Sequence, residues 1–387
     1  MSEPSPARPS VVIIGGGYAG INAAKSLDDV ADVVLVEPKD AFVHNVAALR
    51  ALVDPGWLPR IYLPYGGLLS HGRVVQDRAV KVDAGRVTLA SGAELPADYL
   101  VLATGSSYPF PAKSDVDRTV DAHEKTLGTH AALAAAARVL LVGAGAVGIE
   151  LAGEIKAVWP SKQVTLVDVA DDVLGGPFRP ELKAELRRQL ADLGVQVLLG
   201  SPLVAAPPTE PGEPGAFTVR TQAGTEVTAD IWFRCYGVIP VSDYLAGGLA
   251  GARGADGHIE VTPTLQVAGQ DRVFALGDVS TADRKVAGAA GRQAVVVAGN
   301  IRALIEAGPD AAGIVLAEYE LSPPGIVVPI GPEGGSGQRP GSEDLLPPEM
   351  VAQLKGRDMM VGRFAELLGL AAGDADGDLA GDGQPPR

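Results

Sequence analysis

Cysteine is nearly absent from this chain, and Cys235 is the only one among 387 residues. A single cysteine cannot form an intrachain disulfide, and it cannot form the redox-active pair that relays electrons in flavin disulfide reductases. Cys235 stands in an apolar segment, where a cysteine is usually inert packing. Disulfide chemistry is therefore excluded as the basis of the function.

Long apolar runs and basic runs are missing too. No segment reaches the ~18 uninterrupted apolar residues that a membrane-spanning helix needs, and residues 1–10 lack the apolar core of a signal peptide. Lys and Arg number 32 against 47 Asp and Glu, a formal charge of −15. This balance argues against a nucleic-acid partner and against broad docking on anionic lipid. We expect a cytoplasmic protein with at most transient membrane contact.

Metal and hydrolase motifs do not occur either. The histidines show no H-x-x-x-H or H-E-x-x-H spacing, and no serine stands in a G-x-S-x-G elbow. We therefore expect no metal site and no serine-hydrolase chemistry.

Glycine, by contrast, falls into two matching motifs. Residues 15–20 read Gly-Gly-Gly-Tyr-Ala-Gly after the apolar run 11–14, and residues 143–148 read Gly-Ala-Gly-Ala-Val-Gly after the run 139–142. Each G-x-G-x-x-G motif thus lies between a predicted strand and a predicted helix. Backbone amides at such a helix N-terminus can hold a pyrophosphate, because glycine lets it approach closely. The chain therefore predicts two dinucleotide sites.

An acid closes the strand that follows each glycine motif. Glu37 comes 22 residues after Gly15, and Asp168 comes 25 residues after Gly143. Both are placed to accept hydrogen bonds from an adenosine ribose. A carboxylate at Asp168 pairs well with a free 2′-hydroxyl and repels a 2′-phosphate, so we expect NADH to be preferred over NADPH.

The order of the remaining elements indicates a nested α/β chain. We expect helices at 19–27, 147–158, 180–193 and 286–305, strands at 33–36, 86–89, 99–102, 195–199, 230–235 and 273–276, and an irregular loop at 331–344. This order predicts two Rossmann-like domains of three ββα layers, the second inserted in the first, and a small C-terminal α+β section. The expected boundaries are 10–112 with 241–310 for FAD, 113–240 for NAD(P)H, 311–370 for the C-terminal section, and disordered tails at 1–9 and 371–387.

Four blocks in this order resemble the two-dinucleotide flavoprotein superfamily of pyridine-nucleotide-dependent reductases. They are the first glycine motif with Glu37, residues 103–105 with the prolines after them, the second glycine motif with Glu150, and Gly277-Asp278. Within this superfamily, residues 44–50, 109–113 and 154–156 are similar to the ferroptosis suppressor protein branch, also called apoptosis-inducing-factor-like. Its members reduce quinones with NAD(P)H through FAD. The resemblance spans about residues 11–310 well and is weaker from 311 to 370.

By position, the resemblance implies a role for individual residues. Arg50 would neutralise phosphate charge, Ala79 would line the adenine, and Asp278 would bind the ribityl chain. Lys113 would lie close to the flavin ring, where a cation stabilises the reduced anionic flavin, and Glu150 would lie beside the nicotinamide. The other FAD contacts would be Gly15, Gly16, Gly17, Tyr18, Ala19, Gly20, Glu37, Ala103, Thr104, Gly105 and Gly277, and the other NADH contacts Gly143, Gly145, Ala146, Val147, Gly148, Asp168 and Gly237.

Simpler interpretations stand beside several of these roles. Arg50 and Lys113 could be solvated surface charges, and Glu150 could be a carboxylate stabilised by the helix dipole alone. The branch has an aromatic residue near the flavin where this chain has Met359-Met360. The apolar positions at 359–370 could touch a membrane, but a helix packed on the other domains is the favoured interpretation.

The resemblance implies an FAD-dependent oxidoreductase that takes hydride from NADH and passes electrons to a quinone or another small-molecule acceptor. A reductase for a protein acceptor is one alternative, although the acidity of the chain argues against an acidic ferredoxin. A non-enzymatic NADH-responsive flavoprotein sensor is another. A type II NADH dehydrogenase is a close neighbour of the main interpretation.

Overall fold

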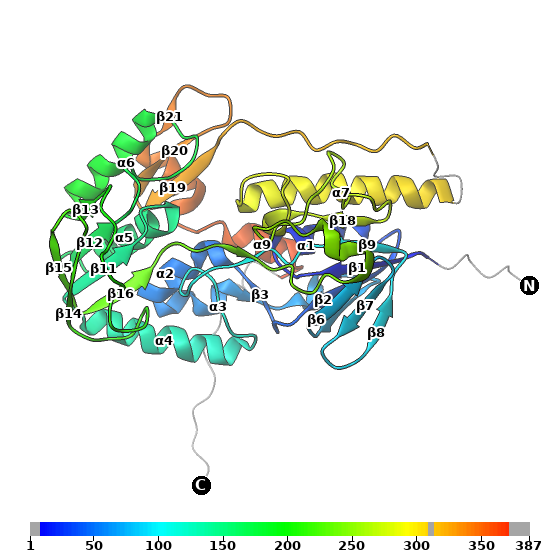
Figure 1. Ribbon diagram of the computed structural model, residues 1–387, viewed down its shortest axis with the longest axis horizontal. Helices are drawn as coiled ribbons and strands as arrows, with labels where there is room; N and C mark the ends of the chain where they lie inside the picture. Colours follow the sequence, from blue (N-terminus) through cyan, green and yellow to red (C-terminus); the bar gives the residue numbers. More distant parts are fainter. Residues whose placement is uncertain (1–7, 309–312, 371–387) are drawn as a thin grey trace, which may run out of the picture.

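The first α/β unit is built on a parallel five-stranded sheet (Figure 1). The computed structural model describes residues 8–308 and 313–370, so the predicted tails fall outside it apart from residues 8 and 9. The sheet has the order β18-β9-β1-β2-β5. Its strands are β1 (Ser10–Ile14), β2 (Asp32–Glu37), β5 (Arg73–Gln76), β9 (Tyr99–Leu102) and β18 (Val273–Ala275).

Both faces of this sheet are covered. Val11 and Ile13 pack against α1 (Tyr18–Leu27) and α7 (Ala287–Ala307), whereas Val12 and Ile14 pack against an antiparallel sheet on the other side. A strand buried on both faces needs a continuous apolar run, and the run at 11–14 provides it. The covering sheet consists of β6 (Ala79–Asp83), β7 (Arg86–Leu89) and β8 (Glu94–Pro96).

The second unit repeats these layers. Its parallel sheet has the order β13-β12-β11-β16, with helices on one face and the β14-β15 hairpin on the other. The strands are β11 (Arg138–Val142), β12 (Gln163–Val167), β13 (Gln196–Leu198), β14 (Phe217–Arg220), β15 (Glu226–Ala229) and β16 (Ile231–Arg234), and the helices are α4 (Thr119–Ala135), α5 (Ala146–Val158) and α6 (Pro180–Asp192).

The second unit is inserted between β9 and β18 of the first sheet. The chain leaves through β10 (Ser106–Ser107) and returns through β17 (Ile239–Pro240), which pair antiparallel, and β18 then joins β9. The predicted fold class is confirmed. A smaller group of elements lies between the units: β3 (Phe42–Val43), α2 (Ala48–Val53), α3 (Leu58–Ile61) and β4 (Tyr62–Leu63).

The C-terminal section adds a small antiparallel sheet and short helices. They are β19 (Ile326–Ile330), β20 (Gly334–Gln338), β21 (Leu345–Leu346), α8 (Pro348–Val351), the π-helical turn η7 (Ala352–Gly356) and α9 (Val361–Leu367). Among the helices described, none combines the length and apolar composition of a membrane span.

The irregular loop predicted at 331–344 is wrong, because it contains the central strand β20. Its sequence, Gly-Gly-Ser-Gly-Gln, lacks the β-branched and aromatic residues that mark a strand. A Cβ on Gly335 would lie 2.3 Å from the Val328 carbonyl oxygen, so the glycines permit an unusually close approach to β19. The side-chain amide of Gln189 on α6 also binds both the N–H and the C=O of Gly335, at 2.7 and 2.9 Å. Tertiary contacts therefore make this strand.

Candidate functional site

The first glycine motif forms the turn from β1 into α1. Gly15 has a φ of +103°, and a Cβ there would lie 2.4 Å from the Ala103 carbonyl oxygen. A Cβ on Gly20 would lie 1.8 Å from the Gly15 carbonyl oxygen, so α1 and the turn are in contact. Gly17, at the N-cap of α1, has open space where its Cβ would be. Turn, close packing and an open approach are the three tasks of a dinucleotide motif.

The second motif repeats this arrangement between β11 and α5. Gly143 has a φ of +111°, and a Cβ there would lie 2.7 Å from the Cys235 carbonyl oxygen. A Cβ on Gly148 would lie 1.9 Å from the Gly143 carbonyl oxygen. Gly145, the N-cap of α5, again has open space. Each unit therefore offers an unobstructed helix N-terminus that fits a pyrophosphate.

The two acids also adopt matching geometry. Glu37 accepts hydrogen bonds from the Gly16 and Lys39 amides, at 2.7 and 3.0 Å. Asp168 accepts from the Ala144 and Ala170 amides, at 2.5 and 2.8 Å. In each unit, the acid binds the second residue of its glycine motif and the second residue after itself. Burial raises the pKa of Glu37, and the two amides oppose that shift.

Tyr65 supports the first motif and was not predicted. Its hydroxyl donates to the Gly16 carbonyl oxygen at 2.9 Å, and a Cβ on Gly16 would lie 2.4 Å from that hydroxyl. Tyr65 is separated from Gly16 by 49 residues, and no local pattern marks it.

The structure brings Lys113 and Asp278 together at the junction between the units. The Lys113 ammonium lies 3.2 Å from the Asp278 carboxylate, and it donates to the Ser106 hydroxyl and carbonyl oxygens at 2.8 Å each. The Ser106 hydroxyl in turn donates to Asp278 at 2.7 Å. Lys113 is therefore paired, contrary to the solvated-charge interpretation, and Ser106 is an unpredicted member of this group.

The neighbouring predicted residues hold the backbone at this junction. The Thr104 hydroxyl donates to the Val241 carbonyl oxygen at 2.6 Å, and Gln293 of α7 accepts from the Gly277 amide at 2.6 Å. Gly237 has a φ of +104° in the segment from β16 to β17. The other predicted residues lie at the ends or starts of elements. Ala103 and Gly105 follow the end of β9, Ala79 begins β6, Tyr18 and Ala19 lie in the first turn of α1, and Ala146 and Val147 lie in the first turn of α5.

Arg50 binds a protein carboxylate. Its guanidinium pairs with both oxygens of Glu154 on α5 and donates to the Gly356 carbonyl oxygen at 2.8 Å. Arg50 is 6% exposed and Glu154 is 1% exposed. These contacts contradict a solvated surface charge at Arg50, and phosphate neutralisation stays a prediction beside the ion pair that the structure shows. Because α2 faces α5 across the junction, Arg50 links both units and the C-terminal section.

Glu150 lies one turn before Glu154 on the same helix face. Its carboxylate accepts from the Lys355 ammonium at 2.8 Å, so a second buried ion pair ties α5 to the C-terminal section. Burial raises the pKa of Glu150, the Lys355 charge opposes that shift, and the Glu154 carboxylate adds to it. No local pattern marks Lys355 as the partner of Glu150, because the two residues are 205 positions apart.

An aromatic cluster joins the C-terminal section to the first unit. His44 is fully buried, which lowers its pKa to about 4, so its ring is neutral. Its Nε2 lies 2.7 Å from the Met359 carbonyl oxygen, which can only accept, so Nδ1 accepts the Tyr18 hydroxyl at 3.1 Å. The ring centre of Phe364 on α9 lies 4.9 Å from that of His44 and 5.0 Å from that of Tyr18.

Phe364 therefore supplies an aromatic residue from the C-terminal section, although positions 359 and 360 are methionines. Met359 is 1% exposed and lies in the core of the first unit with Phe364 and Leu368. These contacts favour the packed-helix interpretation of the apolar positions at 359–370.

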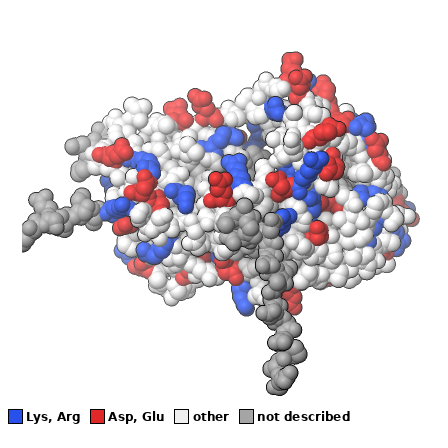
Figure 2. Space-filling model, turned by 180° about the vertical axis from the view of Figure 1, so that it is seen from behind, with Lys and Arg blue, Asp and Glu red and all other residues white. Residues whose placement is uncertain are grey.

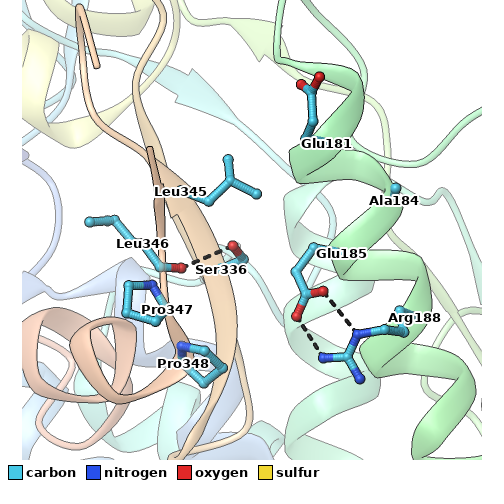
Figure 3. Close-up of a pocket in the computed structure, with 9 residues that line it drawn as sticks. All are labelled: Glu181, Ala184, Glu185, Arg188, Ser336, Leu345, Leu346, Pro347 and Pro348. Carbon is cyan, nitrogen blue, oxygen red and sulfur yellow. Dashed lines mark hydrogen bonds and ion pairs between the residues drawn. The ribbon is translucent and has the colours of Figure 1, made fainter. Parts of the chain in front are cut away.

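An open groove of about 570 Å³ lies apart from these groups, between α6 and the β20-β21 edge (Figure 3). Its walls show a Glu185–Arg188 pair and a Ser336 hydroxyl bound to the Leu346 carbonyl oxygen. None of the predicted site residues lines it.

Acidic and basic side chains are mixed over the face seen in Figure 2. Among the residues described, no three His, Cys, Asp or Glu are grouped to hold a metal ion.

Two matching dinucleotide motifs, each with its acid, in units held together by buried ion pairs define a two-dinucleotide oxidoreductase. A family model described as pyridine nucleotide-disulphide oxidoreductase matches residues 9–298. The ferroptosis suppressor protein 1 of Taeniopygia guttata is 32% identical over 368 residues, which cover 93% of this chain and 95% of that protein. The chain therefore belongs to the pyridine nucleotide-disulphide oxidoreductase family and to its ferroptosis suppressor protein branch. It is an FAD-dependent enzyme that uses a nicotinamide dinucleotide.

Solved structures show the same fold. The sulfide:quinone oxidoreductase of Aquifex aeolicus aligns over 93% of this chain and 91% of that chain, with a TM-score of 0.73 and 18% identity. The NDH2 of Plasmodium falciparum in complex with NADH aligns over 95% and 96%, with a TM-score of 0.72 and 12% identity.

Substituting Gly145 by alanine tests the open approach at the second motif. No atom lies within 4 Å of the added Cβ, so we expect an unchanged unfolding midpoint and full FAD content. Because the Cβ occupies the space over the α5 N-terminus, the KM for NADH should rise by about tenfold or more, since each 1.4 kcal/mol of lost binding is tenfold. Gly299→Ala in α7, which also has open space, is the matched control. An unchanged KM in Gly145→Ala would remove the second motif from NADH binding.

Proposed function

We propose that this chain oxidises NADH and reduces a quinone, with FAD at the first glycine motif and NADH at the second. The observation that carries the proposal is the repeated geometry at Glu37 and Asp168, each of which binds its own glycine motif beside an open helix N-terminus. The branch to which the chain belongs and the quinone in the name of the Aquifex aeolicus structural neighbour support the acceptor class.

The residues of the chain supply binding, orientation and charge. Bound flavin would accept hydride and pass electrons to the acceptor. Lys113, held by Ser106 and Asp278, presents an ammonium at the junction, where its positive charge would stabilise the reduced anionic ring of a bound flavin. Glu150, which stands two residues after the second motif, is held by an ion pair with Lys355. Cys235 takes no part, because burial raises the pKa of its thiol to about 12 and it has no second cysteine.

Anaerobic stopped-flow absorbance tests the proposal directly. The purified flavoprotein is mixed with NADH and then with a short-chain ubiquinone or menaquinone. We expect rapid bleaching of the flavin band, followed by rapid return on adding quinone. Bleaching without recovery would move the acceptor to a protein, or the function to NADH sensing, and absence of bleaching would remove NADH as the donor.

We also propose that Asp168 makes the enzyme prefer NADH. Asp168→Ala removes the acceptor for a ribose hydroxyl and the charge that repels a 2′-phosphate. The ratio of kcat/KM for NADH to that for NADPH should fall by about 10–100-fold, since a hydrogen bond to a charged group contributes about 1.5–3 kcal/mol. Asp192→Ala, an exposed acid on α6 of the same unit, should leave the ratio unchanged. An unchanged ratio in Asp168→Ala would place the discrimination elsewhere.

A further inference from the structure

Residues 313–325 form an extended strap that leads into β19. The strap contains no helix or strand and runs along α7 (Figure 1). Val315 is 95% exposed and Leu321 is 68% exposed, whereas Leu316 and Tyr319 pack against the core of the first unit. Polar contacts add to this partial burial in fixing its position.

The middle of the strap is fixed to α7 by one amide side chain. Asn300, which is 2% exposed, accepts from the Ala317 amide at 2.8 Å and donates to the Ala317 carbonyl oxygen at 2.9 Å. It also donates to the Thr264 carbonyl oxygen at 3.1 Å. The Tyr319 amide donates to the Pro263 carbonyl oxygen at 2.8 Å. The backbone at Tyr319 is thereby held from two sides.

The side chain of Tyr319 reaches a different part of the first unit. Its hydroxyl donates to the Asp283 carboxylate at 2.6 Å, and the Asp283 side chain is only 5% exposed. Arg292 of α7 lies 3.6 Å from the same carboxylate and 3.4 Å from the Tyr319 hydroxyl. One residue further along the loop, Arg284 donates to the Ser322 carbonyl oxygen of the strap at 2.9 Å.

Asp283 and Arg284 belong to the loop 280–286, which joins Asp278 to the start of α7. The Lys285 ammonium donates to the Ser280 and Asp283 carbonyl oxygens, so the loop is cross-linked within itself. Ser280 is fully buried, and its amide donates to the Gly277 carbonyl oxygen at 3.1 Å. Because this short segment is hydrogen-bonded within itself, fixing the position of Asp283 also restricts the backbone at Gly277 and Asp278.

We propose that Tyr319 is a positioning residue for the FAD site. Through Asp283 it holds loop 280–286, and with it Asp278 and the first turn of α7, against the strap. The C-terminal section thus controls how firmly the first unit retains its flavin. The inference rests on the proposed binding of FAD at the first motif and adds the residue that fixes one wall of that site.

Tyr319→Phe keeps the ring and removes the hydroxyl. We expect FAD to dissociate about tenfold faster from the variant, because Asp283 loses a hydrogen bond at a nearly buried carboxylate. The rate is measured from the flavin absorbance that the protein retains during dialysis against FAD-free buffer. The KM for NADH should not change, since the second unit is untouched.

Tyr99→Phe is the matched control, because Tyr99 is a largely buried tyrosine of β9 in the same unit with a different role. Asp283→Ala should accelerate FAD loss as Tyr319→Phe does, and the double variant should add little to either. Thermal unfolding of the FAD-free proteins separates local from general effects: the apo variant should unfold close to the apo wild type.

Each outcome has a distinct meaning. Equal FAD loss from wild type and Tyr319→Phe, or equal acceleration in Tyr99→Phe, would overturn the proposal while leaving the oxidoreductase function intact. Strictly additive effects of Tyr319→Phe and Asp283→Ala would also overturn it. A wild-type protein that holds no FAD would instead contradict the proposed function itself.

Discussion

Replacing Arg50 by alanine is expected to lower the free energy of unfolding by about 3–5 kcal/mol, the usual cost of breaking a buried ion pair from one side. The guanidinium pairs with Glu154, which is 1% exposed, and it lies 5.2 Å from the Trp57 ring centre. Its removal leaves an unpaired carboxylate at the junction of the two units. Denaturant unfolding measures the loss, and Arg357→Ala is the control, because the exposed Arg357–Glu333 pair should contribute less than about 1 kcal/mol.

The paired substitution separates an ion pair from a phosphate contact. If Arg50 serves Glu154, Arg50→Met combined with Glu154→Met should recover most of the lost stability, since apolar side chains of similar volume replace the pair. If Arg50 instead neutralises FAD phosphate, the double variant will fold but remain poor in flavin. Flavin content after gel filtration therefore decides between the two roles.

The pH dependence of Arg50→Ala has a definite sign. Burial raises the pKa of Glu154 and Arg50 opposes that shift, so removing Arg50 raises the folded-state pKa further above its unfolded value. Between those two pKa values the folded state binds more protons than the unfolded state, and stability rises as pH falls. The deficit of Arg50→Ala relative to wild type should therefore shrink on acidification.

Local motifs account for what the sequence predicted well. The glycine motifs and their acids lie within short segments whose strand-turn-helix geometry follows from residue type alone. The helices expected at 19–27 and 147–158 agree with α1 and α5 to within one residue. Nothing beyond local chemistry was needed to place them.

Partner choice across the junction could not be predicted in the same way. Arg50 meets Glu154 from 104 positions away, and Lys355 meets Glu150 from 205. The sequence offers many charges of either sign, and only the packing of α2, α5 and η7 selects these pairs. The resemblance placed Lys113 and Asp278 in one site, and the structure adds Ser106 as the hydroxyl between them.

The structure explains the place of the single cysteine of this chain. The family is named for disulfide chemistry, yet the single cysteine here is buried behind the second glycine motif, with its carbonyl oxygen against Gly143. Cys235 thus packs against the turn from β11 into α5. A single cysteine cannot form the disulfide relay for which the family is named, so a bound flavin would have to pass its electrons on without that relay.

Gly20→Ala should be among the most damaging single substitutions in the first unit. The added Cβ would lie 1.8 Å from the Gly15 carbonyl oxygen, a backbone atom that cannot swing away as a flexible side chain could. Helix and turn must separate, at a cost of about 3 kcal/mol or more. We expect little soluble folded protein, or a large drop in the unfolding midpoint of what remains.

Gly17→Ala, three residues earlier, should behave differently, because no atom lies within 4 Å of its added Cβ. We expect normal folding, measured by circular dichroism and thermal unfolding of the FAD-free protein, together with loss of bound FAD. If both variants fold and keep FAD, the first motif is not the flavin site. If both variants fail to fold, Gly17 is needed for folding as Gly20 is. The division of roles, in which Gly20 permits packing and Gly17 leaves open space for a ligand, is then wrong.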